Sequence, residues 1–208
     1  MGKIIIIGAS GTIGRAVCDL LEEEHDVIRV GNHQGDHTID LGSRTDIETL
    51  FERLGTVDAV ISTAGQSRFA HLLEANDEDF GLGIDNKLMG QVNLTRTALR
   101  YLAETGVITL TSGLLAREPW PGTVPTAMVN AALEGFVRAA ALDLPRGMRI
   151  NVVSPIFVTE TAVKLGMDTV GSMPASETAK AYRASLLGEM TGHVLDVRKY
   201  GKMKGDDQ

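Results

Sequence analysis

The stretch Lys3-Ile-Ile-Ile-Ile-Gly-Ala-Ser-Gly-Thr-Ile-Gly14 carries four isoleucines, without a polar break, into three glycines. A continuous β-branched run predicts a strand buried on both faces, as in the centre of a parallel sheet. Gly8 allows a tight turn from strand to helix, Gly11 lets a ligand approach bare backbone, and Gly14 lets the helix pack closely. The free amides at the start of that helix would face a phosphate. The stretch therefore predicts a dinucleotide-binding turn.

Three glycines in a surface loop would look much the same, so the residues after them decide the interpretation. A strand before the glycines and an amphipathic helix after them form the context that a nucleotide-binding turn requires. We therefore predict dinucleotide binding here, against the alternative of a structural turn. The apolar side chains that recur at helical spacing after the turn are Ile13, Ala16, Val17, Leu20 and Leu21.

Composition places the chain among ordinary globular proteins. Its 208 residues are 43% hydrophobic and carry a net charge of −7, which fits one domain with a proper core. The negative balance predicts no nucleic-acid partner, because a surface that follows phosphates needs an excess of Lys and Arg. No apolar run approaches a membrane span, and residues 1–3 lead into a strand rather than a secretory signal. We therefore expect no membrane partner and a cytoplasmic location.

Cysteine and histidine usage predicts no metal site. The single cysteine, Cys18, falls on the inner face of the first expected helix, where we expect a small core residue rather than a nucleophile. His33 and His37 stand four residues apart, which would suit a metal on a helix, but their segment is rich in glycine and polar residues. We expect neither an internal disulfide nor a bound metal.

Strand and helix signals alternate along the chain. This alternation predicts a single-domain, doubly wound parallel sheet of the Rossmann type over residues 1–197, followed by a polar C-terminal tail over 198–208. Ligands of such sheets bind at the carboxyl ends of the strands, so the loops after residues 7, 30, 61, 111 and 153 should meet at one site. The expected strands lie near 3–7, 26–30, 57–61, 106–111, 148–153 and 193–197, and the expected helices near 12–24, 44–54, 77–102, 124–142 and 176–188.

Two of these helices carry patterns that fit contact with a second subunit. Packing on their own sheet accounts for one face of each helix, and a residual face could pair with another copy. We therefore expect a homodimer or homotetramer through helices 77–102 and 124–142. The patterns are a 4-3-4-3 spacing at Leu88, Val92, Thr95, Leu99 and Leu102, and a small-residue stripe at Ala131, Gly135 and Ala139.

Five further segments, in order, complete a family resemblance. They are Asp40-Leu41, Ser62-Thr63-Ala64-Gly65, Thr111-Ser112-Gly113, Asn151-Val-Val-Ser-Pro155 and Thr191-Gly-His-Val-Leu-Asp-Val197. With the glycine turn, they resemble the short-chain dehydrogenase/reductase family over nearly the whole chain. The resemblance implies an adenine contact at Asp40-Leu41, an adenine-side wall at Ala64 and Gly65, a catalytic serine at Ser112, and a nicotinamide contact at Pro155.

The family's Tyr-x-x-x-Lys motif is missing. Asn130-Ala-Ala-Leu-Glu-Gly-Phe136 closely resembles the sequence that normally begins at the family's lysine, so Asn130 stands at the lysine position and Thr126 at the tyrosine position. The family tyrosine donates a proton to the carbonyl, and a threonine hydroxyl is far too weak an acid for that work. Losing a general acid typically costs about 10² to 10⁴ in rate. Hydride transfer is therefore expected to be impaired rather than abolished.

One lysine offers compensation. Aligning the family's Asn-x-x-Gly element on Gly90 places Lys87 where a fourth catalytic residue, an asparagine, usually stands. Aligning Asn86 instead would demand an insertion inside a helix. We predict that the Lys87 ammonium reaches the site vacated at Asn130 as proton donor or ribose anchor, against the alternative of a solvated lysine. Ser112 is expected to hydrogen-bond a substrate oxygen, against the alternative of a capping serine.

The second strand ends without an acid. After Val30 the chain reads Gly-Asn-His, with no carboxylate for the two ribose hydroxyls that distinguish NAD. Asn32 falls where NADP-preferring relatives often carry arginine, and Arg15 and His33 offer donors to a 2′-phosphate. We therefore predict that NADP is preferred over NAD.

The connection after this strand is also short. Only a handful of residues separate Val30 from the Thr38-Ile-Asp40 segment, too few for a helical crossover. We therefore expect the sheet to be shortened between its second and third strands, without the helix that normally covers the adenosine side.

The leading prediction is an atypical oxidoreductase that binds NADP(H) and acts on a small carbonyl or alcohol substrate by a variant proton relay. The competing prediction is a regulatory or structural protein that binds a dinucleotide without turnover. Residues Phe157 to Ser176, which include Met167 and Met173, are expected to form an apolar lid. The expected cofactor contacts are Gly8, Ser10, Gly11, Thr12, Ile13, Gly14, Arg15, Asn32, His33, Asp40, Leu41, Ala64, Gly65, Pro155 and Thr159.

Overall fold

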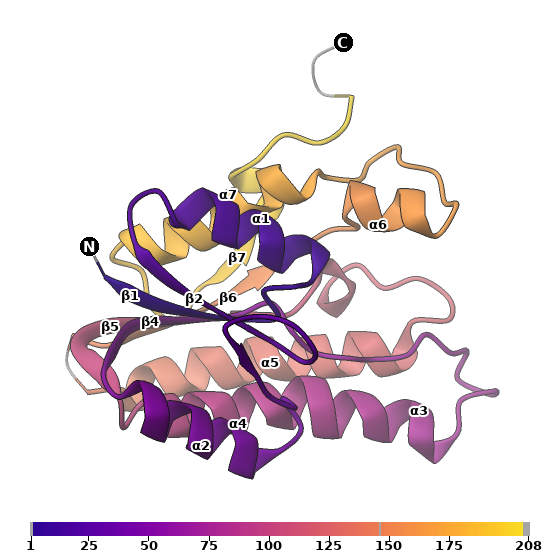
Figure 1. Cartoon of the computed structure of the whole chain (residues 1–208). Coiled ribbons are helices and arrows are strands. Elements are labelled where there is room, and N and C mark those ends of the chain that lie inside the picture. The colour runs from indigo at the N-terminus through magenta and orange to yellow at the C-terminus, as the bar shows by residue number, and fades with distance from the viewer. Residues whose placement is uncertain (1, 146, 206–208) are drawn as a thin grey trace.

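A computed structural model describes residues 2–145 and 147–205, so the last three residues of the expected tail lie outside the described residues. Its centre is one parallel seven-stranded sheet with strand order β3-β2-β1-β4-β5-β6-β7 (Figure 1). This order confirms the doubly wound α/β architecture. The strands are β1 (Lys3–Ile7), β2 (Asp26–Gly31), β3 (His37–Thr38), β4 (Val57–Ser62), β5 (Leu102–Thr111), β6 (Arg149–Ser154) and β7 (Val194–Asp196).

The isoleucine run forms β1, near the middle of the sheet. It pairs with β2 on one side and β4 on the other, and Ile4 to Ile7 are all buried. Ile5 and Ile7 face one hydrophobic core, whereas Ile4 and Ile6 face the other. The run is apolar throughout because a strand covered by helices on both faces buries both sets of alternating side chains.

Helices cover both faces of the sheet (Figure 1). Two of them, α1 (Thr12–Leu21) and α7 (Ala175–Leu187), pack together on one face. The opposite face carries α2 (Arg44–Leu54), α4 (Met89–Ala98) and α5 (Val124–Asp143). Cys18 lies on the buried face of α1, and burial raises the pKa of its thiol to about 11. This agrees with the expectation that Cys18 is a core residue.

The connection from β2 to β3 contains no helix, as its length predicted. Residues 32–36 turn the chain, and β3 then pairs with the end of β2, Val30 opposite His37. Gly35 makes the turn with a φ of +140°, and a Cβ there would lie 2.5 Å from the Arg29 carbonyl oxygen. β3 could not be predicted from the sequence, because a strand of two residues is too short to show an alternation of apolar and polar side chains.

The predicted helix over 77–102 is confirmed only as far as Ala98, with a π-helical stretch inside it, and its last four residues are wrong. The segment divides into α3 (Asp77–Leu82), a π-helical stretch η1 (Gly83–Leu88) and α4, which ends at Ala98. Leu102 instead begins β5, where it is buried and pairs with Val57. Sheet pairing therefore overrides the helical spacing of the leucines. Tyr101, just before the strand, stacks on Phe51 with ring centroids 5.6 Å apart.

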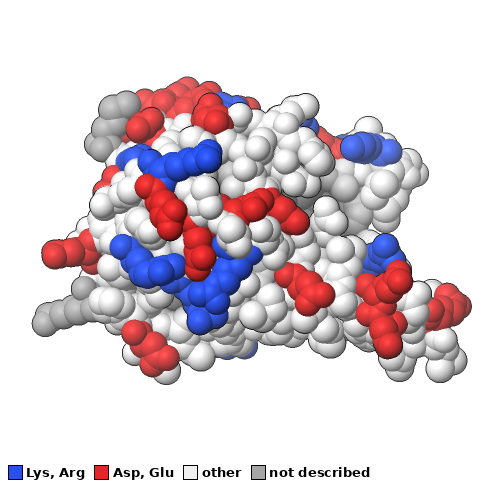
Figure 2. All heavy atoms as spheres, turned by 60° about the horizontal axis from the view of Figure 1, so that its bottom comes forward, with Lys and Arg blue, Asp and Glu red and all other residues white. Residues whose placement is uncertain are grey.

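Three short elements complete the chain. They are η2 (Leu114–Ala116), α6 (Thr159–Lys164) and η3 (Val197–Lys199). The sequence analysis did not predict α6, whose six residues are too few to show a helical period. No helix among the described residues is long and apolar enough to cross a membrane. Figure 2 shows basic side chains interleaved with acidic ones on one face. Arg44 and Arg100 both pair with Glu48.

Candidate active site

Two adjoining hollows lie at the carboxyl ends of the strands, and Thr63 lines both. The first, the glycine-turn pocket, has a volume of about 480 Å³. Its lining includes eight of the expected cofactor contacts: Gly8, Ser10, Gly11, Asn32, Asp40, Leu41, Ala64 and Gly65. Of the loops that the sequence predicted to converge, those after residues 7, 30 and 61 line this pocket, and those after residues 111 and 153 line the second one. They meet at one edge because every strand of this sheet runs in the same direction.

The geometry of the glycine turn explains its residues. Gly8 has a φ of +85°, which favours glycine. A Cβ at Gly14 would lie 2.0 Å from the Gly8 carbonyl oxygen, so only glycine lets α1 approach the turn. A Cβ at Gly11 would meet only that same oxygen, at 3.2 Å, and its other side is open. Gly11 therefore leaves the turn uncovered by a side chain, while its own N–H donates to the Gly8 carbonyl at 2.9 Å.

The other expected cofactor contacts lie elsewhere. Ile13 and Pro155 line the second hollow. Thr12, Gly14 and Arg15 belong to the first turn of α1 and do not line either pocket, and neither does His33. His33 is exposed, with Nε2 3.3 Å from Asn32 Nδ2. Thr159 begins α6, and its hydroxyl lies 2.7 Å from Ser172 Oγ, so this hydroxyl already has a hydrogen-bond partner.

The second hollow, the serine pocket, has a volume of about 300 Å³. All four residues expected to be catalytic line it: Lys87, Ser112, Thr126 and Asn130. They come from η1, from the end of β5 and from α5, so only the tertiary structure brings them together. The structure thus places the four candidates in one pocket beside the glycine turn.

Lys87 reaches the floor of the serine pocket. Its Nζ donates a hydrogen bond to the main-chain oxygen of Ser112 at 2.9 Å, and burial lowers its pKa to about 8. The side chain crosses Gly65, where a Cβ would lie 2.6 Å from Lys87 Cγ. Asn86 turns to the glycine-turn pocket and accepts from the Gln66 N–H at 2.8 Å. The π-helical turn thus separates two adjacent residues into two pockets.

Thr126 and Asn130 lie on the side of α5 that lines the serine pocket. The Thr126 hydroxyl lies 3.0 Å from Ser67 Oγ and donates to the Arg68 carbonyl at 2.9 Å, so it anchors the loop after β4. Asn130 is 2% exposed, and its Oδ1 is without a hydrogen-bond partner among the described residues. An unpaired buried amide oxygen is costly.

A carboxylate lies behind Ser112, and the sequence analysis missed it. Ser112 Oγ is 3.3 Å from Glu134 Oε1 on α5, and Glu134 is 4% exposed. The available signal was its position four residues after Asn130, which places both on the same face of a helix. The hydroxyl also lies 3.4 Å from the Val153 carbonyl oxygen.

The serine pocket continues into an outer pocket of about 370 Å³, and the two share Leu114, Trp120, Ile156 and Phe157. Met167 lines the outer pocket and is about half exposed, as expected of a lid residue. Met173, however, is fully buried in the core, and its N–H donates to the Phe157 carbonyl at 3.0 Å. Met173 therefore belongs to the core and not to the apolar lid in which it was expected.

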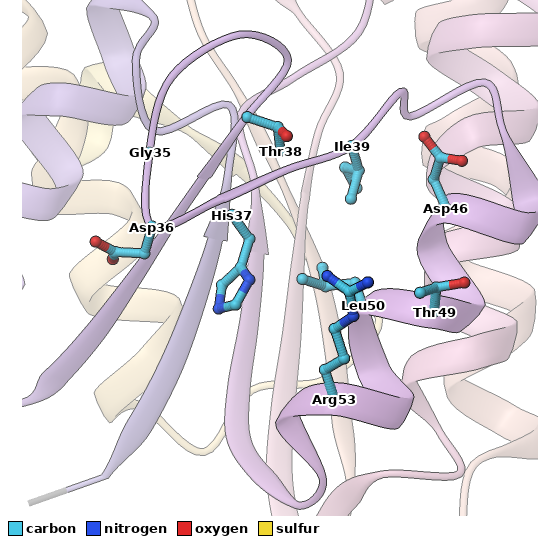
Figure 3. Close-up of a pocket in the computed structure, with 9 residues that line it drawn as sticks. All are labelled: Gly35, Asp36, His37, Thr38, Ile39, Asp46, Thr49, Leu50 and Arg53. Atoms are coloured by element: carbon cyan, nitrogen blue, oxygen red, sulfur yellow. The ribbon is translucent and has the colours of Figure 1, made fainter.

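A fourth hollow, the edge pocket, has a volume of about 460 Å³ and lies between β3 and α2 (Figure 3). Figure 3 shows His37 beside Leu50 and Arg53, in the space between β3 and α2. None of the predicted cofactor or catalytic residues lines it. Among the described residues, no group of three or more His, Cys, Asp or Glu is placed to hold a metal ion.

The strand order, the glycine turn and the pocket at its mouth define a Rossmann-type dinucleotide-binding protein. Residues 11–191 match the family model described as Enoyl-(Acyl carrier protein) reductase. The chain belongs to the short-chain dehydrogenase/reductase family, a family of oxidoreductases.

Known proteins with similar sequences or structures agree. The crystal structure of the protein lin1944 from Listeria innocua is 38% identical, with a TM-score of 0.90 over 95% of this chain and 100% of that one. A small-chain dehydrogenase crystallised in complex with NADPH is 28% identical, with a TM-score of 0.84 over 93% and 95%. Carbonyl reductase family member 4 of Xenopus laevis is 26% identical over 95% of this chain and 97% of its own length. Across curated relatives, the matched segment spans between 49% and 97% of the relative's length.

Proposed function

We propose that the chain is an NADP(H)-dependent reductase of small carbonyl compounds in which Lys87 supplies the proton. The observation that carries this proposal is the position of Lys87 in the serine pocket, with Nζ held at 2.9 Å from the Ser112 carbonyl and a pKa lowered to about 8. An ammonium with a pKa near neutrality is a good general acid. The names of two relatives, a carbonyl reductase and an NADPH complex, support the same chemistry.

The pocket residues fit a nicotinamide dinucleotide, which supplies the hydride when bound. Gly8 and Gly11 would face the pyrophosphate, Asp40 and Leu41 the adenine, and Pro155 the nicotinamide. Asn130, at the position of the family's lysine, lines the serine pocket and would lie at the ribose side. These residues bind and orient the cofactor, while Lys87 handles the proton.

The preference for NADP rests on the residues at the end of β2. Asn32 lines the glycine-turn pocket, and no acid stands at its position to bind a ribose diol. Three acids nearby are already engaged. Glu22 pairs with Arg29, Asp36 accepts from the Arg29 N–H at 2.8 Å, and Asp40, which lines the same pocket, accepts from the Gly42 N–H at 2.8 Å. A 2′-phosphate in this pocket would therefore meet the amide of Asn32, whose Nδ2 lies 3.3 Å from Nε2 of the exposed His33.

Two further parts of the proposal concern assembly and location. Ala131, Gly135 and Ala139 on α5 are exposed, and a Cβ at Gly135 would meet nothing within 4 Å, so this stripe supports a homodimer or homotetramer. Val92 and Leu99, from the pattern in the other expected helix, are partly buried. The other helix therefore contributes less to the proposed contact between subunits. A cytoplasmic location remains a prediction of the sequence.

A two-stage experiment tests the proposal. NADPH binding is first measured by nicotinamide fluorescence, and a panel of small ketones and aldehydes is then screened for NADPH oxidation. Lys87→Met should lower turnover by about 10² to 10⁴ with little change in NADPH affinity. Lys180→Met, an exposed lysine on α7, is the matched control. Binding without turnover across the panel would instead support a non-catalytic dinucleotide-binding protein.

A further inference from the structure

The Ser112 hydroxyl is surrounded by acceptors. In the part of the chain that the structure describes, the groups within hydrogen-bonding distance of Ser112 Oγ are Glu134 Oε1 at 3.3 Å and the Val153 carbonyl oxygen at 3.4 Å. A carboxylate and a carbonyl accept hydrogen bonds, and the hydroxyl carries one hydrogen and two lone pairs. The hydrogen is therefore directed at these oxygens, and the lone pairs are left for a group in the serine pocket.

The Glu134 carboxylate is held in place from behind. Arg117 Nε lies 3.7 Å and Arg138 Nη1 3.9 Å from its two oxygens. Arg117 also contacts Asp196 at 3.6 Å and donates to Ser154 Oγ at 3.0 Å, so its guanidinium is fixed at several points. A buried carboxylate without such cations would be costly. Glu134 therefore remains an acceptor facing Ser112.

Lys87 presents the opposite kind of group to the same pocket. Its ammonium has three N–H donors, of which one is used by the Ser112 carbonyl. A ligand oxygen in the serine pocket thus meets a donor from Lys87 and an acceptor at Ser112 Oγ. An alcohol oxygen can both accept and donate, whereas a carbonyl oxygen can only accept.

We propose that Glu134 is a positioning residue that fixes Ser112 as a hydrogen-bond acceptor, so that the site binds the alcohol form of its substrate more tightly than the carbonyl form. The inference rests on the serine pocket being the substrate site of the proposed oxidoreductase. Beyond that function, the inference names Glu134 as the residue that orients the Ser112 hydroxyl, and the alcohol as the form of the ligand that this orientation favours.

Binding of a shape-matched pair, cyclohexanol and cyclohexanone, tests the inference without turnover. Dissociation constants of both probes are measured by ligand-observed NMR, first on the protein without cofactor. They are then measured on two complexes in which no reaction can occur, the alcohol with the NADPH-bound protein and the ketone with the NADP⁺-bound protein. Wild type should bind cyclohexanol more tightly than cyclohexanone. In Glu134→Gln the carboxamide N–H can donate to Ser112 Oγ, which leaves the Val153 carbonyl at 3.4 Å as the remaining internal acceptor and lets the hydroxyl hydrogen turn into the pocket. The affinity for cyclohexanol should then fall about tenfold, with that for cyclohexanone unchanged or increased.

A double-mutant cycle separates positioning from structural damage. Ser112→Ala should remove the preference for cyclohexanol by itself, and Glu134→Gln should have no further effect on the preference in that background. Glu48→Gln, which alters an ion-paired glutamate on α2, is the matched control and should leave both affinities unchanged.

Three outcomes would overturn the inference. They are equal or absent binding of the two probes by wild type, a parallel loss of both affinities in Glu134→Gln, and a preference for the alcohol that survives Ser112→Ala. If Glu134→Gln does not fold, the Ser112→Ala measurement still decides the origin of the preference. Failure of the proposed function would appear separately, as absent NADPH binding or as turnover that persists in Lys87→Met.

Discussion

Lys87 Nζ donates to the main-chain carbonyl of Ser112 at 2.9 Å, although 25 residues separate the two in sequence. The π-helical turn η1 directs the lysine into the serine pocket, and the bare backbone of Gly65 makes room for its stem. Such single π turns within helices are frequent at functional sites. The contact joins the end of β5 to the long helical segment beside it, and it holds an ammonium at the proposed reaction centre.

The pH dependence of reduction should follow the protonation of this lysine. Burial lowers the pKa of Lys87 to about 8, so the ammonium form predominates below that pH and is lost above it. The rate of carbonyl reduction at saturating NADPH should be level near pH 6–7 and fall about tenfold per unit well above pH 8. A stopped-flow pH profile measures this. A level profile up to pH 10 would show that another group supplies the proton.

Gly11→Asp should weaken NADPH binding by on the order of 100-fold, about 3 kcal/mol, while the fold is retained. The added carboxylate would stand at the open side of the turn, where a pyrophosphate must approach backbone. Fluorescence titration of NADPH measures the loss, and circular dichroism checks the fold. Gly81→Asp on α3 is the matched control, because a Cβ there meets nothing within 4 Å. Equal NADPH affinities for wild type and Gly11→Asp would remove the basis for cofactor binding at this turn.

NADPH should bind more tightly than NADH, and Asn32→Asp should reverse the order. A carboxylate at the end of β2 would accept from the ribose hydroxyls of NADH and repel the 2′-phosphate of NADPH. The reversal should amount to about tenfold or more, since one favourable and one repulsive contact change together. Titrations of both dinucleotides at one salt concentration measure it. Tighter NADH binding by wild type would contradict the prediction.

Thr126→Val should leave turnover within about threefold of wild type, far less than the 10² to 10⁴ expected for a general acid. The Thr126 hydroxyl is already bonded to Arg68, so its removal should cost about 1 kcal/mol of stability instead. Thermal unfolding and steady-state kinetics separate the two effects. Ser67→Ala, which removes the other hydroxyl of this contact, should behave alike. A collapse of turnover in a folded Thr126→Val would place the threonine in the chemistry.

The features that could be predicted from the sequence depend on residues that are close together along the chain. The isoleucine run and the glycine turn predicted β1, α1 and the site between them, because the apolar run and the close contact of Gly14 with Gly8 both lie within one short segment. The short spacing after Val30 ruled out a crossover helix by length alone. Local periodicity failed at Leu102, where pairing with Val57 decided in favour of a strand.

The site's hydrogen bonds were decided by tertiary structure. Thr126 meets Arg68 across 58 residues, and Ser112 meets Glu134 across 22. The sequence placed Thr126 and Ser112 at family positions but gave no sign of these partners, since the partners depend on how α5 packs against the ends of β4 and β5. The choice between Asn86 and Lys87 likewise depended on one π-helical turn. Packing sets the direction of a side chain, whereas sequence spacing sets only its place along the backbone.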